Sequence, residues 1–194
     1  MHKLMRQDLM TLEQYSIERP QLRSEVIAHK QRRTVQVGPN MTWCFEDRTT
    51  IRYQVLEMLR AERIFESSGI QDELDAYNPL IPSGSNWKVT LLLEFPEAEA
   101  RRAALAKLIG VEDRCWVRTS EMERVFAIAD EDIDRENEEK TSAVHFLRFE
   151  LTPSMIAAVK GAGSLSVGVD HDSYRHTVAP LPDAVRDALA RDLD

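Results

Sequence analysis

The sequence predicts an α+β fold, with a mostly antiparallel sheet of about six or seven strands and helices packed mainly on one face. Two observations predict it. Short segments alternate apolar and polar residues and are joined by turn residues, as in hairpins. Longer segments repeat apolar residues at helical spacing between capping residues. The chain has 194 residues, 43% hydrophobic and 30% charged, without a break in composition. We therefore expect a single domain over residues 1–194.

The strands are predicted from period-two alternation. Segments 34–37 and 41–46 should pair as a hairpin around Gly38 and Pro39. Segment 87–95 is apolar at every second position, which is typical of a strand with one buried face. The remaining strands are expected at 114–119, 123–129, 144–151 and 165–169.

The helices are predicted from spacing and caps. The strongest is 50–66, capped by Thr49 or Thr50. Its apolar stripe comprises Ile51, Val55, Met58, Glu62 and Phe65. Pro20 should begin a second helix, because a proline in the first turn leaves no hydrogen bond unmade. The other helices are expected at 8–18, 20–32, 70–76, 97–109, 152–161 and 181–193. One common core is expected to contain Leu91, Leu93, Leu147, Phe149, Val55 and Met58.

Charge and cysteine content limit the classes of function. Lys and Arg total 25 against 33 Asp and Glu, a net charge of −8, and no basic stripe with aromatic residues is present. We therefore expect no nucleic-acid partner, because binding depends on neutralising phosphates. Cys44 and Cys115 are isolated, which favours two unpaired thiols in a reducing compartment. No apolar run approaches membrane-span length, so the protein is expected to be cytoplasmic and free of membrane contact.

Three residues break an apolar pattern and are candidate metal ligands. Glu62 lies in the stripe of the long helix, His29 lies on a stripe with Leu22, and His145 shares a strand face with Leu147. Together they would offer a His/carboxylate site for iron, manganese or zinc. The alternative is structural: Glu62 pairs with an arginine or lies at the stripe's edge, and both histidines are hydrogen-bonded core residues.

A second group of candidates is polar and would bind a ligand. Tyr53, Glu57 and Arg60 follow one edge of the long helix at i, i+4 and i+7, and Arg148 lies on the strand face opposite His145. The alternative is a solvated helix face with a local ion pair. If the protein is a small-molecule-binding module, the loop 77–86, which contains two prolines and a glycine, would form the rim of its site.

The sequence contains no recognisable catalytic motif. It lacks a P-loop, a dinucleotide-binding glycine motif, a nucleophile elbow and a zinc-protease helix motif. Segment 130–140 is strongly acidic and should be a solvated loop or helix, since an EF-hand would need a glycine where Arg135 stands. Three hypotheses remain open: a non-catalytic accessory protein, a metal-dependent enzyme, and a small-molecule-binding module.

Several long strings resemble one bacterial family. They are Val26 to Lys30, Phe45 to Thr49, Tyr53 to Arg60, Glu73 to Pro82, Ala129 to Asp132 and Lys140 to Glu150. Over nearly its whole length the chain resembles the family of domain of unknown function 3501. The family has no established reaction, so the resemblance assigns no catalytic residues.

The resemblance implies a physiological context. Members are commonly encoded beside rubrerythrin-like di-iron proteins and iron–sulfur oxidoreductases, so it implies a redox or oxidative-stress role with such a protein as partner. This chain itself has too few cysteines for an iron–sulfur cluster and lacks the paired Glu-x-x-His motifs of a di-iron bundle. The sequence does not indicate an oligomeric state, a substrate or a reaction.

Overall fold

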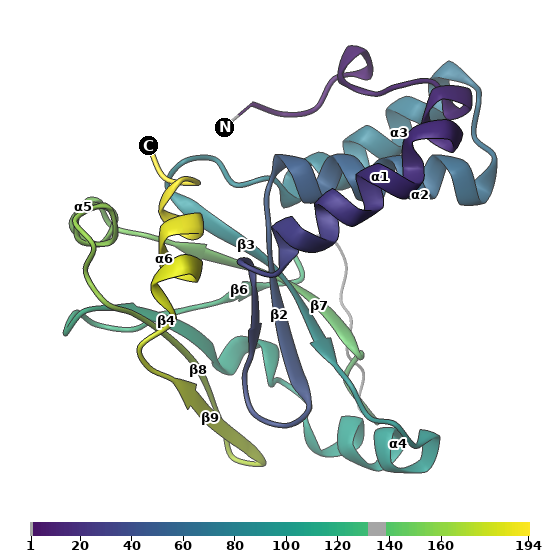
Figure 1. The fold of residues 1–194 in the computed structure, drawn as a ribbon. Helices are drawn as coiled ribbons and strands as arrows, with labels where there is room; N and C mark the ends of the chain where they lie inside the picture. Colours follow the sequence, from purple (N-terminus) through teal and green to yellow (C-terminus); the bar gives the residue numbers. More distant parts are fainter. Residues whose placement is uncertain (1, 132–138) are drawn as a thin grey trace.

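The protein has an α+β fold with two antiparallel sheets (Figure 1). The computed structural model describes residues 2–131 and 139–194. The first sheet has the order β1-β2-β3-β7-β6 and the second β5-β4-β8-β9. The first sheet contains β1 (Thr34–Gln36), β2 (Met41–Glu46), β3 (Asn86–Leu93), β7 (Val144–Glu150) and β6 (Ile128–Ala129). The second sheet contains β5 (Val125–Phe126), β4 (Cys115–Thr119), β8 (Leu165–His171) and β9 (Tyr174–Val178). The predicted fold class is confirmed, with the strands divided between two sheets.

The strongest strand predictions are confirmed. β1 and β2 form the expected hairpin, and β3 alternates buried and half-buried residues along most of its length. The predicted strand 123–129 is two short strands, because β5 pairs with β4 whereas β6 pairs with β7 in the other sheet. β9 was not predicted from the sequence. It is an edge strand with exposed polar positions, so its apolar alternation is weak.

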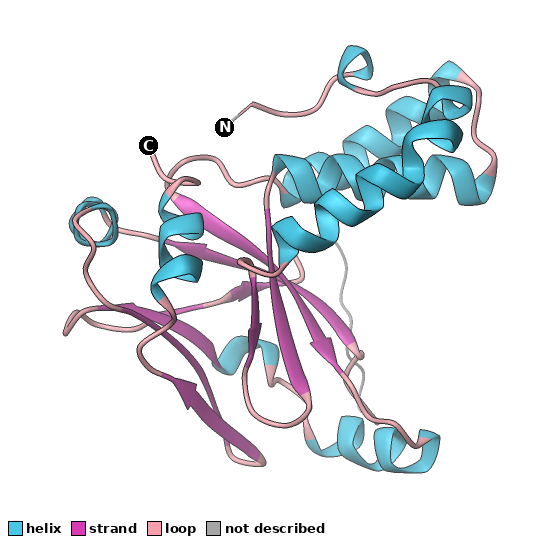
Figure 2. Cartoon of the chain, in the orientation of Figure 1, coloured by secondary structure: helices cyan, strands magenta, loops and turns pink. Residues whose placement is uncertain are grey.

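The helices occupy separate parts of the molecule (Figure 2). The helices α1 (Leu12–Lys30), α2 (Arg48–Glu62) and α3 (Ser67–Tyr77) form one layer, together with the 3-10 turns η1 (Arg6–Asp8) and η2 (Asn78–Leu80). The helices α5 (Pro153–Lys160) and α6 (Asp183–Ala190) pack against each other beside the second sheet, and α4 (Ala98–Lys107) and η3 (Glu112–Arg114) connect β3 to β4.

Two helix predictions differ from the structure. The expected break at Pro20 is wrong, because α1 runs through that residue as one helix. Thr11 caps its start, and Tyr15 and Val26 are buried on either side of the proline, so packing outweighs the single hydrogen bond that Pro20 cannot make. α2 is capped by Asp47 rather than by Thr49 or Thr50, since the Asp47 carboxylate accepts from the Thr50 amide.

The apolar residues form two cores rather than one. The larger core lies between the two sheets and contains Leu91, Leu93, Leu147 and Phe149. The smaller core lies within the helical layer and comprises Leu4, Ile51, Val55, Leu59, Leu74 and Ile81. The expectation that Val55 shares a core with the strands is therefore wrong, since α2 packs mainly on α1 and α3.

Three further expectations concern the two cysteines, membrane-spanning helices and the acidic segment. Cys44 and Cys115 are both free thiols. Within the described ranges, no helix combines the length and the apolar character needed to cross a membrane. Most of the acidic segment 130–140 lies outside the described residues, so its expected solvated structure stays a prediction.

Candidate functional site

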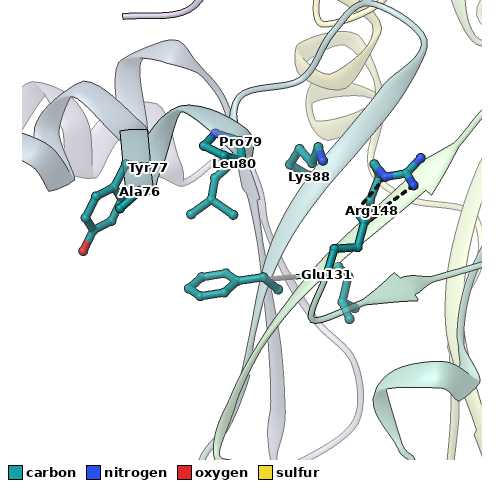
Figure 3. Close-up of a pocket in the computed structure, with 9 residues that line it drawn as sticks. Ala76, Tyr77, Pro79, Leu80, Lys88, Glu131 and Arg148 are labelled. Carbon is teal, nitrogen blue, oxygen red and sulfur yellow. Dashed lines mark hydrogen bonds and ion pairs between the residues drawn. The ribbon is translucent and has the colours of Figure 1, made fainter. Parts of the chain in front are cut away.

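A cavity of about 270 Å³ lies between the helical layer and the outer face of the first sheet (Figure 3). Helix α3 and the turn η2 form one wall, and strands β3 and β7 form the other. Its lining residues are Ala76, Tyr77, Pro79, Leu80, Lys88, Glu131, Phe146, Leu147 and Arg148. The lining is mostly apolar with a few charged groups at one end, which is the usual composition of a small-molecule site.

The helical wall is fixed by Asn78. Its side-chain oxygen accepts from the Leu4 amide at 2.7 Å, and its side-chain nitrogen donates to the Leu4 carbonyl at 3.0 Å. Asn78 is buried, so this pair holds η2 and the N-terminal segment together. Tyr77, Pro79 and Leu80 are therefore presented to the cavity from an anchored turn, and the predicted rim 77–86 contributes its first residues to the cavity.

The strand wall carries two cations side by side. In the antiparallel pairing of β3 with β7, Lys88 lies directly opposite Arg148. Arg148 is balanced: its Nε and Nη2 each donate to Glu131 at 2.8 Å, and its Nη1 donates to Glu150 at 2.7 Å. The Arg148 guanidinium lowers the pKa of Glu131 below its ordinary value.

The environment of Lys88 differs from that of Arg148. Its ammonium is half-buried and forms neither an ion pair nor a hydrogen bond with any residue in the described part of the chain. Burial lowers the pKa of Lys88 below its ordinary value, and the charge of Arg148 acts in the same direction. The charges of Glu131 and Glu150 act the other way without cancelling the effect of burial.

His145 lies on the opposite face of β7, inside the larger core. It is 0% exposed. Its Nδ1 lies 2.6 Å from Asp130 Oδ2, and because a carboxylate only accepts, Nδ1 donates. Its Nε2 lies 2.9 Å from Thr141 Oγ1, 3.1 Å from the Ser142 carbonyl and 3.7 Å from Glu112 Oε2. Both ring nitrogens therefore have partners.

Asp130 connects this buried histidine to the cavity. Its other carboxylate oxygen accepts from the Phe146 amide at 2.9 Å, and its own amide donates to the Phe146 carbonyl at 2.9 Å. Asp130 has φ 46°, a left-handed conformation that Asp tolerates better than most residues. The next residue, Glu131, holds Arg148 in the cavity. The His145 cluster and the cavity wall are thus joined by two consecutive residues, Asp130 and Glu131.

The His145 cluster has the composition of a metal site. Glu112, Asp130 and His145 each offer one ligand atom, and these atoms lie within 4.8 Å of one another. The cluster contains His145 but neither of the other predicted metal ligands. His29 Nε2 instead lies 2.6 Å from Asp47 Oδ2, at the start of α2.

Glu62 is exposed near the C-terminal end of α2. The buried face of that helix follows Ile51, Val55, Leu56 and Leu59, so the expected stripe through Met58 and Glu62 is displaced by about one residue. The structure therefore does not bring His145, Glu62 and His29 together, and Glu62 is not a buried carboxylate.

The predicted ligand-binding residues are also separated. Glu57 accepts from Arg19 Nε at 2.7 Å, Arg19 Nη2 at 2.8 Å and the hydroxyl of Tyr15, which ties α1 to α2. Hydrogen bonds from Arg19 lower the pKa of Glu57 to about 2. Tyr53 lines a second cavity, of about 390 Å³, between α1 and α2. Arg60 is exposed.

Among the four predicted ligand-binding residues, Arg148 lines the cavity of Figure 3. Glu57 pairs with Arg19 of α1, so its ion pair joins two helices and is not the local pair along one helix face that the alternative expected.

Several site residues were not found from the sequence. Lys88 stands between Trp87 and Val89, where alternation makes it an ordinary outward-facing residue. Glu112 and Asp130 are distant from His145 in the chain, so no spacing signal joins them. Thr141 does stand four residues before His145, but only the turn that precedes β7 brings the two together.

A buried arginine was also missed. Arg33, only 3% exposed, donates to the carbonyls of Phe45 at 3.0 Å, Glu46 at 3.2 Å and Ala188 at 3.3 Å, and pairs with Asp192. It thereby joins the end of α1 to β2 and to the C-terminal helix α6. Burial raises the pKa of the Asp192 carboxyl, although the charge of Arg33 opposes the shift.

The fold and the cavity define a small α+β protein with a two-sheet core, a helical layer and a ligand-sized cavity between layer and sheet. The chain belongs to the family described as protein of unknown function DUF3501, whose model matches residues 3–193. It is similar to a protein of unknown function from Burkholderia pseudomallei, known from a crystal structure, with 51% identity, a TM-score of 0.95 and 100% of each chain covered. No curated protein matches the chain.

Proposed function

We propose that this protein is a non-catalytic binding module for a small, mainly apolar molecule, and that the ligand occupies the cavity between α3 and β7. The observation that carries the proposal is the cavity itself: an apolar lining from two layers, an anchored rim and charged groups at one end only. At about 270 Å³ it lies just below the volume typical of drug-sized ligands, so a smaller molecule fits it.

A blocking variant tests this function. Ala76 is exposed on α3 and lines the cavity, so Ala76→Trp should fill the cavity without disturbing either core. Isothermal titration with octanoate, 1-octanol and octylamine should show that the wild-type protein binds at least one of these probes and that Ala76→Trp does not. Ala100→Trp, at an exposed position on α4, is the matched control and should bind like the wild type. If none of the three probes binds the wild-type protein, the proposal is wrong.

We further propose the redox setting that the family resemblance implies, with a rubrerythrin-like or iron–sulfur protein as the partner of this binding module. Family membership is its support. Size-exclusion chromatography of the purified protein with a purified rubrerythrin-like protein tests it, with and without octanoate. Co-elution supports the setting, and separate elution under both conditions contradicts it for that partner.

A second candidate function is metal binding at Glu112, Asp130 and His145. The spacing of their ligand atoms supports it, and one imidazole with two carboxylates suits iron, manganese or zinc. Metal analysis of protein purified without an affinity tag tests it, with His145→Phe as comparison. Near-stoichiometric metal in the wild type and its loss in the variant are expected; equal trace content in both proteins would leave His145 as a core residue.

A further inference from the structure

We infer that the ligand of the cavity is a small carboxylate with an apolar body, and that Lys88 binds its anionic group. This inference rests on the proposed function, because it names the class of molecule that the same cavity takes. It begins from Lys88, whose half-buried ammonium has no partner among the described residues although charged groups surround it.

Among the described residues, no neighbour of Lys88 on the sheet accepts a hydrogen bond from its ammonium. Across one side it faces Arg148, and like charges directly opposite each other on adjacent strands are destabilising. Across the other side it faces Glu46, whose two carboxylate oxygens accept from the hydroxyls of Thr50 and Thr90. Glu131 and Glu150 are held by Arg148. The nearby carboxylates are thus already engaged by other donors.

A bound carboxylate would supply the hydrogen-bond acceptor that Lys88 lacks among the described residues. A partly desolvated cation regains favourable electrostatic energy when a carboxylate approaches, and a hydrogen bond between charged groups contributes more than a neutral one. Arg148 lies across from Lys88 at the same end of the cavity, where its guanidinium holds Glu131 and Glu150. Figure 3 shows Lys88 and Arg148 on the strand wall, with Leu80 and Tyr77 on the helical wall across from them.

The rest of the cavity selects an apolar body. Tyr77, Pro79, Leu80 and Phe146 line it, so a ligand that extends from Lys88 towards α3 buries hydrocarbon or an aromatic ring. A single ammonium without a hydrogen-bond partner among the described residues matches a monoanion. A phosphate monoester would bring close to two negative charges and would need more donors than Lys88 supplies. These features favour a carboxylate over a phosphate.

Matched probes and two lysine variants test the inference. Octanoate, 1-octanol and octylamine share one chain length and differ in the charge of the head group. The wild-type protein should bind octanoate about tenfold or more tightly than 1-octanol, as expected for one charge-assisted hydrogen bond. Lys88→Met should bind octanoate and 1-octanol equally, and Lys88→Arg should keep the preference for octanoate. Lys107→Met, at an exposed lysine of α4, is the control and should behave like the wild type.

The possible outcomes separate this inference from the proposed function. Equal binding of octanoate and 1-octanol by the wild type, or a preference for octylamine, would overturn the inference and leave the binding module intact. A preference for octanoate that survives in Lys88→Met would also overturn it, because another cation would then bind the anion. Binding of no probe would overturn the proposed function itself. Circular dichroism of Lys88→Met confirms that the variant is folded before it is titrated.

Discussion

Replacing His145 with Phe tests whether the buried network of β7 is a structural unit. Phenylalanine keeps a planar ring of similar size on the core face of the strand, so packing changes little. It removes the contact of Nδ1 with Asp130 and the contact of Nε2 with Thr141. Asp130 and Thr141 then each lose a partner in surroundings that are largely closed to water.

The expected cost follows from these two losses. A buried polar group left without its partner costs about 1–3 kcal/mol, and more when it is charged. Two such groups give an expected loss of about 2–6 kcal/mol in the free energy of unfolding. For a chain of this length each kcal/mol lowers Tm by about 2–4 °C, so the melting temperature should fall by roughly 4–24 °C. Urea unfolding followed by tryptophan fluorescence measures the loss in the free energy of unfolding, since Trp43, Trp87 and Trp116 are buried.

A double-mutant cycle with Asp130→Asn isolates the pair. Asparagine tolerates the left-handed backbone at position 130 and keeps an oxygen for the Phe146 amide. The coupling energy between His145 and Asp130 should be about 1.5–3 kcal/mol. A coupling energy near zero, or a His145→Phe variant as stable as the wild type, would refute the reasoning. A fall in the Tm of the wild type on adding EDTA, absent in His145→Phe, would show that a metal contributes to the network.

Three further predictions concern other charged groups. Arg33→Met should lower the free energy of unfolding by about 3–5 kcal/mol, because it leaves Asp192 buried without its partner. The double variant Arg33→Met/Asp192→Leu should recover part of the lost free energy of unfolding, as measured by urea unfolding. Arg19 holds the pKa of Glu57 at about 2, below its ordinary 4.5. Ionised Glu57 therefore stabilises the fold above pH 4.5, and this contribution is lost as the pH falls through 2. Glu57→Gln should lose less stability than the wild type between pH 5 and 2 in an acid titration followed by circular dichroism. Lys88→Met should raise the unfolding free energy by up to about 1 kcal/mol without ligand, because it removes a like charge opposite another cation; a lower Tm would show that an unidentified contact stabilises this lysine.

The sequence predicts those elements whose own residues show which face is buried or where the chain turns. β3 alternates because one face meets the core between the sheets, and the β1–β2 hairpin has Gly38 at φ 76°, which only a glycine adopts without strain. Neither observation depends on distant parts of the chain. The division into two sheets does depend on them, since β5 and β6 differ in sheet although one residue separates them.

On α2, the predicted apolar stripe and the buried face differ by about one residue. Successive residues on a helix are rotated by about 100°, so stripes through Met58 and Leu59 overlap on the same apolar residues nearer the N-terminus. The phase is decided by the neighbours, and α2 lies against α1 and α3. That contact buries Leu59 and leaves Glu62 in solvent, which removes the argument for Glu62 as a metal ligand.

The cavity could not be predicted because alternation tells which face of a strand is apolar, not what covers the polar face. Lys88 and Arg148 occupy the outer face, which in a sheet exposed on one side would meet water. Here α3 and η2 cover part of that face, so a lysine that the sequence presents as solvated becomes half-buried. A polar face covered by an apolar helix end leaves a space that neither layer fills with its own side chains. The same mismatch produces both the cavity and, at its end, a lysine without a hydrogen-bond partner among the described residues, and it arises only when distant segments meet.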